Sequence, residues 1–223
     1  MSNHATASTT PLLTSGIVAG PLFLGVWLVQ ALTRDGFDPR RHPISLLSLG
    51  DWGWIQSASF VVTGVLFVLA AIGLRRALHG GRGATWGPRL VASFGLGLVL
   101  AGVFVTDPGA GFPAGAPAGA PQQHSWHAML HDVGFIVAQL SWLAACFVFR
   151  SRFAAGGRRG WASACLAAAV GVIAIAGWPD MESLSVRLVI ASAIQLGFLG
   201  ALAALLMPPS KAWIRVRHSV LQV

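Results

Sequence analysis

Charged residues are scarce in this sequence of 223 residues, since Asp, Glu, Lys and Arg together make up only 10% of it. Soluble globular domains carry about 25% charged residues, so most of this chain is not expected to face water. Its hydrophobic content of 55% is typical of segments that lie in a lipid bilayer. The composition therefore indicates an integral membrane protein and argues against a soluble globular domain.

Cysteine is also nearly absent, and the two that occur, Cys146 and Cys165, each lie inside an apolar run. Buried thiols of this kind usually act as small packing residues, so we expect neither a disulfide nor a cysteine metal site. The net charge of +8 does not indicate a nucleic-acid partner. The 15 Lys and Arg residues lie mainly between apolar runs, where such residues direct membrane topology.

Six apolar runs have the length of about 20 residues that is needed to cross a bilayer. The first run lacks a preceding basic segment, so we expect it to be retained as a helix rather than cleaved as a signal peptide. The fold class predicted is all-α: a polytopic membrane protein with a six-transmembrane-helix bundle at residues 11–207, a short segment 1–10 and a basic tail 208–223. The expected helices are about Pro11–Thr33, Trp54–Leu74, Pro88–Thr106, His127–Phe149, Trp161–Trp178 and Val186–Met207. Glycines such as Gly95 and Gly97 should let neighbouring helices approach closely.

Basic residues are divided unequally between the two sides of this bundle. One side carries eleven, namely Arg75, Arg76, Arg82, Arg89, Arg150, Arg152, Arg158, Arg159, Lys211, Arg215 and Arg217. The other side carries four, namely Arg34, Arg40, Arg41 and Arg187. The positive-inside rule then places the protein in the cell membrane with both termini in the cytoplasm.

The acidic residues gather on the opposite, non-cytoplasmic side. All seven lie in or beside its loops, namely Asp35, Asp38, Asp51, Asp107, Asp132, Asp180 and Glu182. Four of the seven histidines share that side, namely His42, His124, His127 and His131. Because acids contribute little to topology, this clustering needs another cause. It predicts that any functional site lies on the non-cytoplasmic side.

Two patterns on that side predict specific chemistry. Ser45 and Ser48 have i, i+3 spacing in an apolar segment that can form a short interfacial helix, and they are candidate catalytic residues. His127 and His131 fall one turn apart after Ser125, a plausible N-cap. With Asp107 they can supply three ligands to a divalent metal such as zinc, which would activate a water at an open fourth position. The alternatives are a structural lid for the serines and a hydrogen-bonded network for the histidines.

Several motifs between residues 34 and 150 carry a family resemblance: Gly36–Pro39, His42–Gly50, Trp54–Gln56, Gly73–Arg76, Gly87–Leu90, Ala101–Pro113 and the His127/His131 pair. In these the chain resembles the bacterial membrane-protein family called "domain of unknown function 998". The resemblance implies a six-helix membrane fold without an established biochemical activity. It also implies a set of recurring polar positions, which correspond to His42, Ser45, Ser48, Asp107, His127 and His131 in this sequence.

Three functions remain open on this evidence. The first is a metal-dependent intramembrane hydrolase acting on a lipid-like substrate, with Asp107, His127 and His131 holding the metal and Ser45 or Ser48 orienting substrate or water. The second is a small-molecule or ion transporter, for which the main midplane polar candidates are Gln139, Ser141 and Gln195. The third is a non-catalytic membrane component that binds a partner or lipid through its outer loops. The lipid bilayer is the one partner that all three share, and the oligomeric state stays open.

Overall fold

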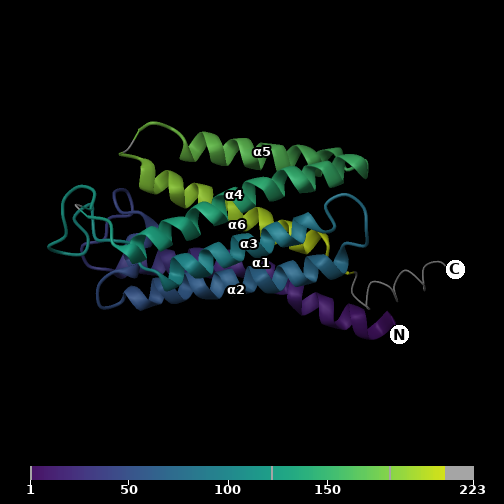
Figure 1. Cartoon of the computed structure of the whole chain (residues 1–223), viewed down its shortest axis with the longest axis horizontal. Helices are drawn as coiled ribbons and strands as arrows, with labels where there is room; N and C mark the ends of the chain where they lie inside the picture. Colours follow the sequence, from purple (N-terminus) through teal and green to yellow (C-terminus); the bar gives the residue numbers. More distant parts are fainter. Residues whose placement is uncertain (1, 122, 181, 209–223) are drawn as a thin grey trace.

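The computed structural model describes residues 2–121, 123–180 and 182–208, and these form a bundle of long helices (Figure 1). Six of the helices are long and apolar enough to cross a membrane. The part of the chain just defined contains no β-strand, only an isolated bridge between Gly109 and Phe112. The predicted all-α, six-helix fold is therefore confirmed. In chain order the elements are α1 (Ser2–Thr33), the 3-10 helix η1 (Ile44–Ser48), α2 (Gly53–Ala77), α3 (Trp86–Val103), α4 (Trp126–Ala155), α5 (Arg159–Ala176) and α6 (Leu184–Leu205).

Two helices extend beyond the apolar runs that predicted them. α1 begins at Ser2 rather than near Pro11, although its membrane-length apolar part begins only at Thr9. α4 continues past Phe149 to Ala155. Hydropathy identifies the part of a helix suited to lipid, whereas backbone hydrogen bonding continues into the polar residues on either side. The predicted basic tail lies outside the described residues from residue 209 onward.

The two ends of the bundle differ in charge. The start of α1, the α2–α3 connection and the α4–α5 turn lie together at one end, on the right in Figure 1. The segment with η1, residues 104–125 and the α5–α6 connection lie at the other end. All seven carboxylates fall in or beside the elements of this second end, which we call the acidic end. Eight of the arginines fall at the first end, which we call the basic end. Which end faces the cytoplasm stays a prediction.

The six helices close into a ring, because each packs against its neighbour in sequence and α6 returns to α1. Packing is tightest around α3. A Cβ atom built on Gly95 would lie 2.5 Å from the carbonyl oxygen of Gly64 on α2, and one built on Gly97 would lie 2.6 Å from that of Gly134 on α4. These backbones are therefore in direct contact, as the glycines predicted. The short helix η1 packs on α2 at the acidic end.

Candidate functional site

The two long connections at the acidic end pack against each other as a small second core, which we call the cap. Its buried side chains are Phe37, Leu46, Leu47 and Phe112. His42 joins the two connections: its Nδ1 accepts the backbone N–H of Asp38 at 2.8 Å, so its Nε2 carries the proton and donates to the carbonyl of Ala110 at 3.1 Å. With both ring nitrogens engaged, His42 holds the cap together.

Asp107 and His127 meet through Ser125 at the start of α4. The two oxygens of Asp107 accept the hydroxyl of Ser125 at 2.6 Å and its backbone N–H at 2.8 Å. His127 Nδ1 lies 3.0 Å from Ser125 Oγ and 2.8 Å from the carbonyl oxygen of Val105. Because a carbonyl oxygen only accepts, Nδ1 carries the proton and donates it to Val105. Ser125 Oγ also accepts the N–H of Ala128, which confirms the predicted N-cap.

The charge on Asp107 follows from these contacts. Burial would raise the pKa of its carboxyl, but the two hydrogen bonds from Ser125 and the charges of His127 and His124 act in the opposite direction, and the net effect is a lowered pKa. Asp107 is therefore an ionised acceptor at neutral pH, bound to the N-cap of α4. This arrangement anchors α4 to the end of α3.

His131 lies one turn further along α4 and contacts the end of α3 directly. Its Nδ1 donates to the carbonyls of Ala101 at 2.8 Å and Phe104 at 3.0 Å, groups left without helical partners where α3 ends. Nε2 is then the acceptor nitrogen of the ring. The side chain is buried and also lines the cavity described below.

The predicted metal ligands are thus held in two places. Across residues 2–121, 123–180 and 182–208 no three His, Cys, Asp or Glu side chains come together as a metal-binding group. The i, i+4 spacing does place His127 and His131 on one helix face, but that face packs against the carbonyl-rich end of α3, which takes both Nδ1 protons. For Asp107 and His127 the contacts describe the hydrogen-bonded network that was the alternative to a metal.

The two candidate serines are separated as well. Ser45 lines the cavity, whereas Ser48 is buried at the end of η1 and does not line it. The chain turns toward α2 at this point, so closely that a Cβ on Gly53 would lie 2.2 Å from the carbonyl oxygen of Ser48. The backbone of Ser48 therefore packs directly against the start of α2.

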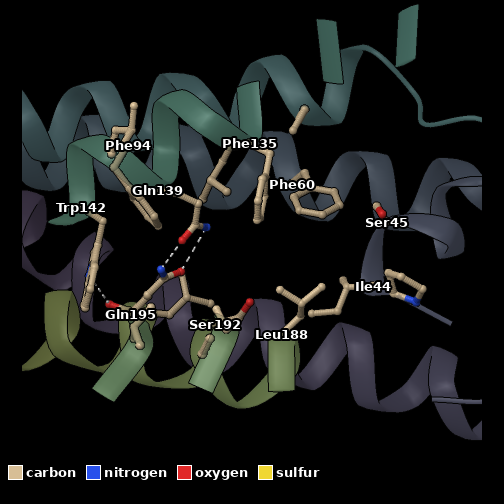
Figure 2. Close-up of a pocket in the computed structure, with 18 of the residues that line it drawn as sticks. Ile44, Ser45, Phe60, Phe94, Phe135, Gln139, Trp142, Leu188, Ser192 and Gln195 are labelled. Atoms are coloured by element: carbon tan, nitrogen blue, oxygen red, sulfur yellow. Dashed lines mark hydrogen bonds between the residues drawn. The ribbon is translucent and has the colours of Figure 1, made fainter. Parts of the chain in front are cut away.

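A cavity of about 510 Å³ occupies the interior of the ring, beneath η1. All six helices and η1 contribute to its wall, with most of the residues coming from α4 and α6. Its body is apolar, as Figure 2 shows for Phe60, Phe94, Phe135 and Leu188. Leu140 on α4 and Ile173 on α5 line it while remaining 62% and 53% exposed. Side chains this exposed are not enclosed by protein, so the cavity wall is open to the surroundings at these two residues.

One polar bridge crosses the cavity halfway along the helices. The side-chain amides of Gln139 on α4 and Gln195 on α6 bond to each other reciprocally (Figure 2). The indole N–H of Trp142 donates to the backbone carbonyl of Gln195 at 3.2 Å. Gln139 and Gln195 were predicted as midplane polar residues, and here each bonds to the other. Ser141, named with them, is buried and does not line the cavity.

The end of the cavity under the cap is polar. Ser45, His131 and Asp132 line it there, and we call these three residues the polar rim. Asp132 is exposed and forms no hydrogen bond or ion pair with another residue of the described chain. Sequence reasoning counted it only among the acids of its side. Its place in the second turn of an apolar helix, next to His131, was the available signal.

A second set of polar groups lies buried between η1, α1 and α2, outside the cavity. Gln30 on α1 donates to Gln56 on α2 at 2.8 Å. Around this bond, six buried side-chain atoms have no hydrogen-bond partner among the described residues: Trp27 Nε1, Gln30 Oε1, Ser48 Oγ, Gln56 Nε2, Ser59 Oγ and Thr63 Oγ1. Gln56, Ser59 and Thr63 follow one face of α2. Such groups usually bind ordered water.

Comparison with known proteins places the chain in a family. No curated protein and no solved structure matches it. A family model described as "Protein of unknown function (DUF998)" matches residues 17–207, from α1 through the end of α6. Since this match covers most of the sequence, the chain belongs to the DUF998 family of proteins of unknown function.

Proposed function

We propose that this protein is a non-catalytic membrane component that binds a single-chain, lipid-like amphiphile in its central cavity. The observation that carries the proposal is the cavity of about 510 Å³ with an apolar body and a polar rim at one end. This volume lies within the range of about 300 to 1,000 Å³ usual for small-molecule sites. An amphiphile has the same division between an apolar chain and a polar head.

The depth of the cavity supports a chain that lies along the helices. Asp132 at the rim and Gln139 at the bridge are seven residues apart on α4, which corresponds to about 10 Å along the helix axis. The bridging amides bond to each other, so the oxygen and one N–H of each are already paired, which lowers the cost of covering them with an apolar chain. The exposed part of the wall at Leu140 and Ile173 offers a route from the acyl-chain region of the bilayer.

The contacts of the other candidate residues favour binding over hydrolysis. Asp107 and His127 are engaged with Ser125 and the end of α3, outside the cavity wall. Transport needs midplane polar groups that a solute can reach, whereas Gln139 and Gln195 bond to each other. A binding role uses the cavity and needs neither a metal group nor a continuous polar path.

Native mass spectrometry of the detergent-purified protein tests the proposal, with dodecanol as the added probe and collisional removal of the micelle. Wild type should retain one dodecanol. Ser192→Phe puts a ring into the cavity from α6 and should reduce retention at least tenfold, whereas Ile190→Phe, on the same helix but outside the cavity, should not. No retention by a folded wild-type protein, or equal loss in both variants, would contradict the proposal.

A further inference from the structure

The charges around the polar rim indicate which kind of head group the ligand has. Asp132 is the only Asp, Glu, Lys or Arg residue in the cavity wall of the described chain. It lies in the second turn of α4, within a segment apolar enough to cross a membrane. A carboxylate in the wall of an apolar cavity is stabilised by an opposite charge, yet no described residue bonds to this one.

No basic residue of the acidic end forms an ion pair with Asp132. Arg34 donates to the carbonyls of Leu47 and Leu49, and Arg187 donates to carbonyls at the end of α5. None of Arg34, Arg40, Arg41 and Arg187 lines the cavity. An anionic head group would therefore meet a carboxylate and no cation, which is unfavourable.

The two neutral residues of the rim complete a site for a hydrogen-bond donor. His131 lines the cavity, and its Nε2 is the acceptor nitrogen of the ring, because its Nδ1 carries the proton that the carbonyls of Ala101 and Phe104 accept. Ser45 lines the rim with a hydroxyl, which can accept or donate. A carboxylate, an imidazole acceptor and a hydroxyl suit an ammonium group, which has three donors and no acceptor.

We infer that the ligand is a cationic amphiphile with a primary amine head, held at the rim by Asp132 with its chain in the apolar body of the cavity. This inference rests on the proposed function, because it specifies the head group of the same ligand. An amine keeps its charge paired at the rim, whereas a neutral alcohol leaves Asp132 without a cation. A carboxylate head adds a like charge and should bind most weakly.

Competition between three probes with the same chain length tests the inference. Dodecylamine, dodecanol and dodecanoate are added together at equal concentration near neutral pH, and native mass spectrometry resolves them by mass. In wild type the amine should exceed the alcohol by about fivefold to tenfold, because the rim is partly exposed and the ion pair is screened. Dodecanoate should be the least retained.

Asp132→Asn removes the charge while keeping the shape of the side chain. It should bring the ratio of amine to alcohol close to one without reducing the retention of dodecanol. Asp35→Asn, an exposed acid of the same end outside the cavity, is the matched control and should leave the ratio unchanged. A wild-type ratio near one, or a preference for amine that survives in Asp132→Asn, would overturn the amine assignment alone. Failure to retain any of the three probes would overturn the proposed function itself.

Discussion

The two sides of the helix ring are packed in different ways. On one side, α2, α3 and α4 are in backbone contact at the pairs Gly64/Gly95 and Gly97/Gly134. On the other, α5 and α6 carry glycines such as Gly171 and Gly197 with no atom within 4 Å of a built Cβ. The cavity wall is exposed at Ile173 of α5, on this second side, and at Leu140 of the neighbouring α4.

This difference assigns separate roles to the two sides. Close backbone packing gains dispersion energy and excludes lipid, so the glycine-packed side holds the fold together. The side with α5 and α6 leaves apolar wall exposed in the interior, where a ligand can replace the contacts that the helices do not make. Stability should therefore be most sensitive to substitution on the first side, and binding to substitution on the second.

The largest expected effect comes from Gly97→Val on the packed side. A valine side chain would overlap the backbone of α4, whose Gly134 carbonyl oxygen lies 2.6 Å from the Cβ position. Overpacking of this kind costs about 3 kcal/mol, and more where only backbone can move. The thermal midpoint followed by fluorescence-detected size-exclusion chromatography should fall sharply, or folded protein should be lost.

Gly197→Val on α6 is the matched control, because the same side chain there meets open space. It should leave the midpoint within a few degrees of wild type. Equal losses in the two variants would remove the distinction between the sides of the ring.

A smaller effect is expected at the bridge across the cavity. Gln195→Leu leaves the amide of Gln139 without its partner, and interhelical hydrogen bonds in membranes contribute about 0.6 kcal/mol on average. The single variant should lower stability by about 1 kcal/mol, because a partly buried amide then lacks its bond.

The double variant Gln139→Leu with Gln195→Leu should recover most of that loss, since no amide remains unpaired. The measurement is unfolding in a denaturing detergent, analysed as a double-mutant cycle. Additive losses would mean that the two amides act independently, and α4 and α6 would then lack the connection that spans the cavity.

The sequence was informative about this molecule where its signals are local. Apolar runs gave the number of spanning helices, Gly95 and Gly97 gave the close packing, and Ser125 gave the N-cap of α4. Gln139 and Gln195 were found because polar residues are rare in the middle of apolar runs. Each of these inferences needs only the identity of nearby residues.

The features that the sequence did not reveal depend on which segments meet. The spacing of His127 and His131 predicts that they share a helix face, but it does not predict what packs against that face. In the structure the carbonyls of Val105, Ala101 and Phe104 pack there and accept the Nδ1 protons of the two histidines. The cavity arises because α6 returns to α1 and closes the ring. Asp132 becomes a candidate binding residue only because it lines this cavity, which the sequence does not show.

The smallest effect is expected at Thr63, a buried polar residue of α2. Its hydroxyl is fully buried and has no partner among the described residues, although it lies in a helix that contacts both α1 and α3. An unpaired hydroxyl in an apolar environment is unfavourable, and valine has nearly the same shape without it. Thr63→Val should therefore raise stability slightly, by about 0.5 to 1 kcal/mol.

Ser15→Ala is the contrasting control, because the Ser15 hydroxyl donates a hydrogen bond to the carbonyl of Leu66 on α2 at 2.9 Å and its removal should lower stability. A loss of stability in Thr63→Val would instead show that the Thr63 hydroxyl is hydrogen-bonded in the folded protein.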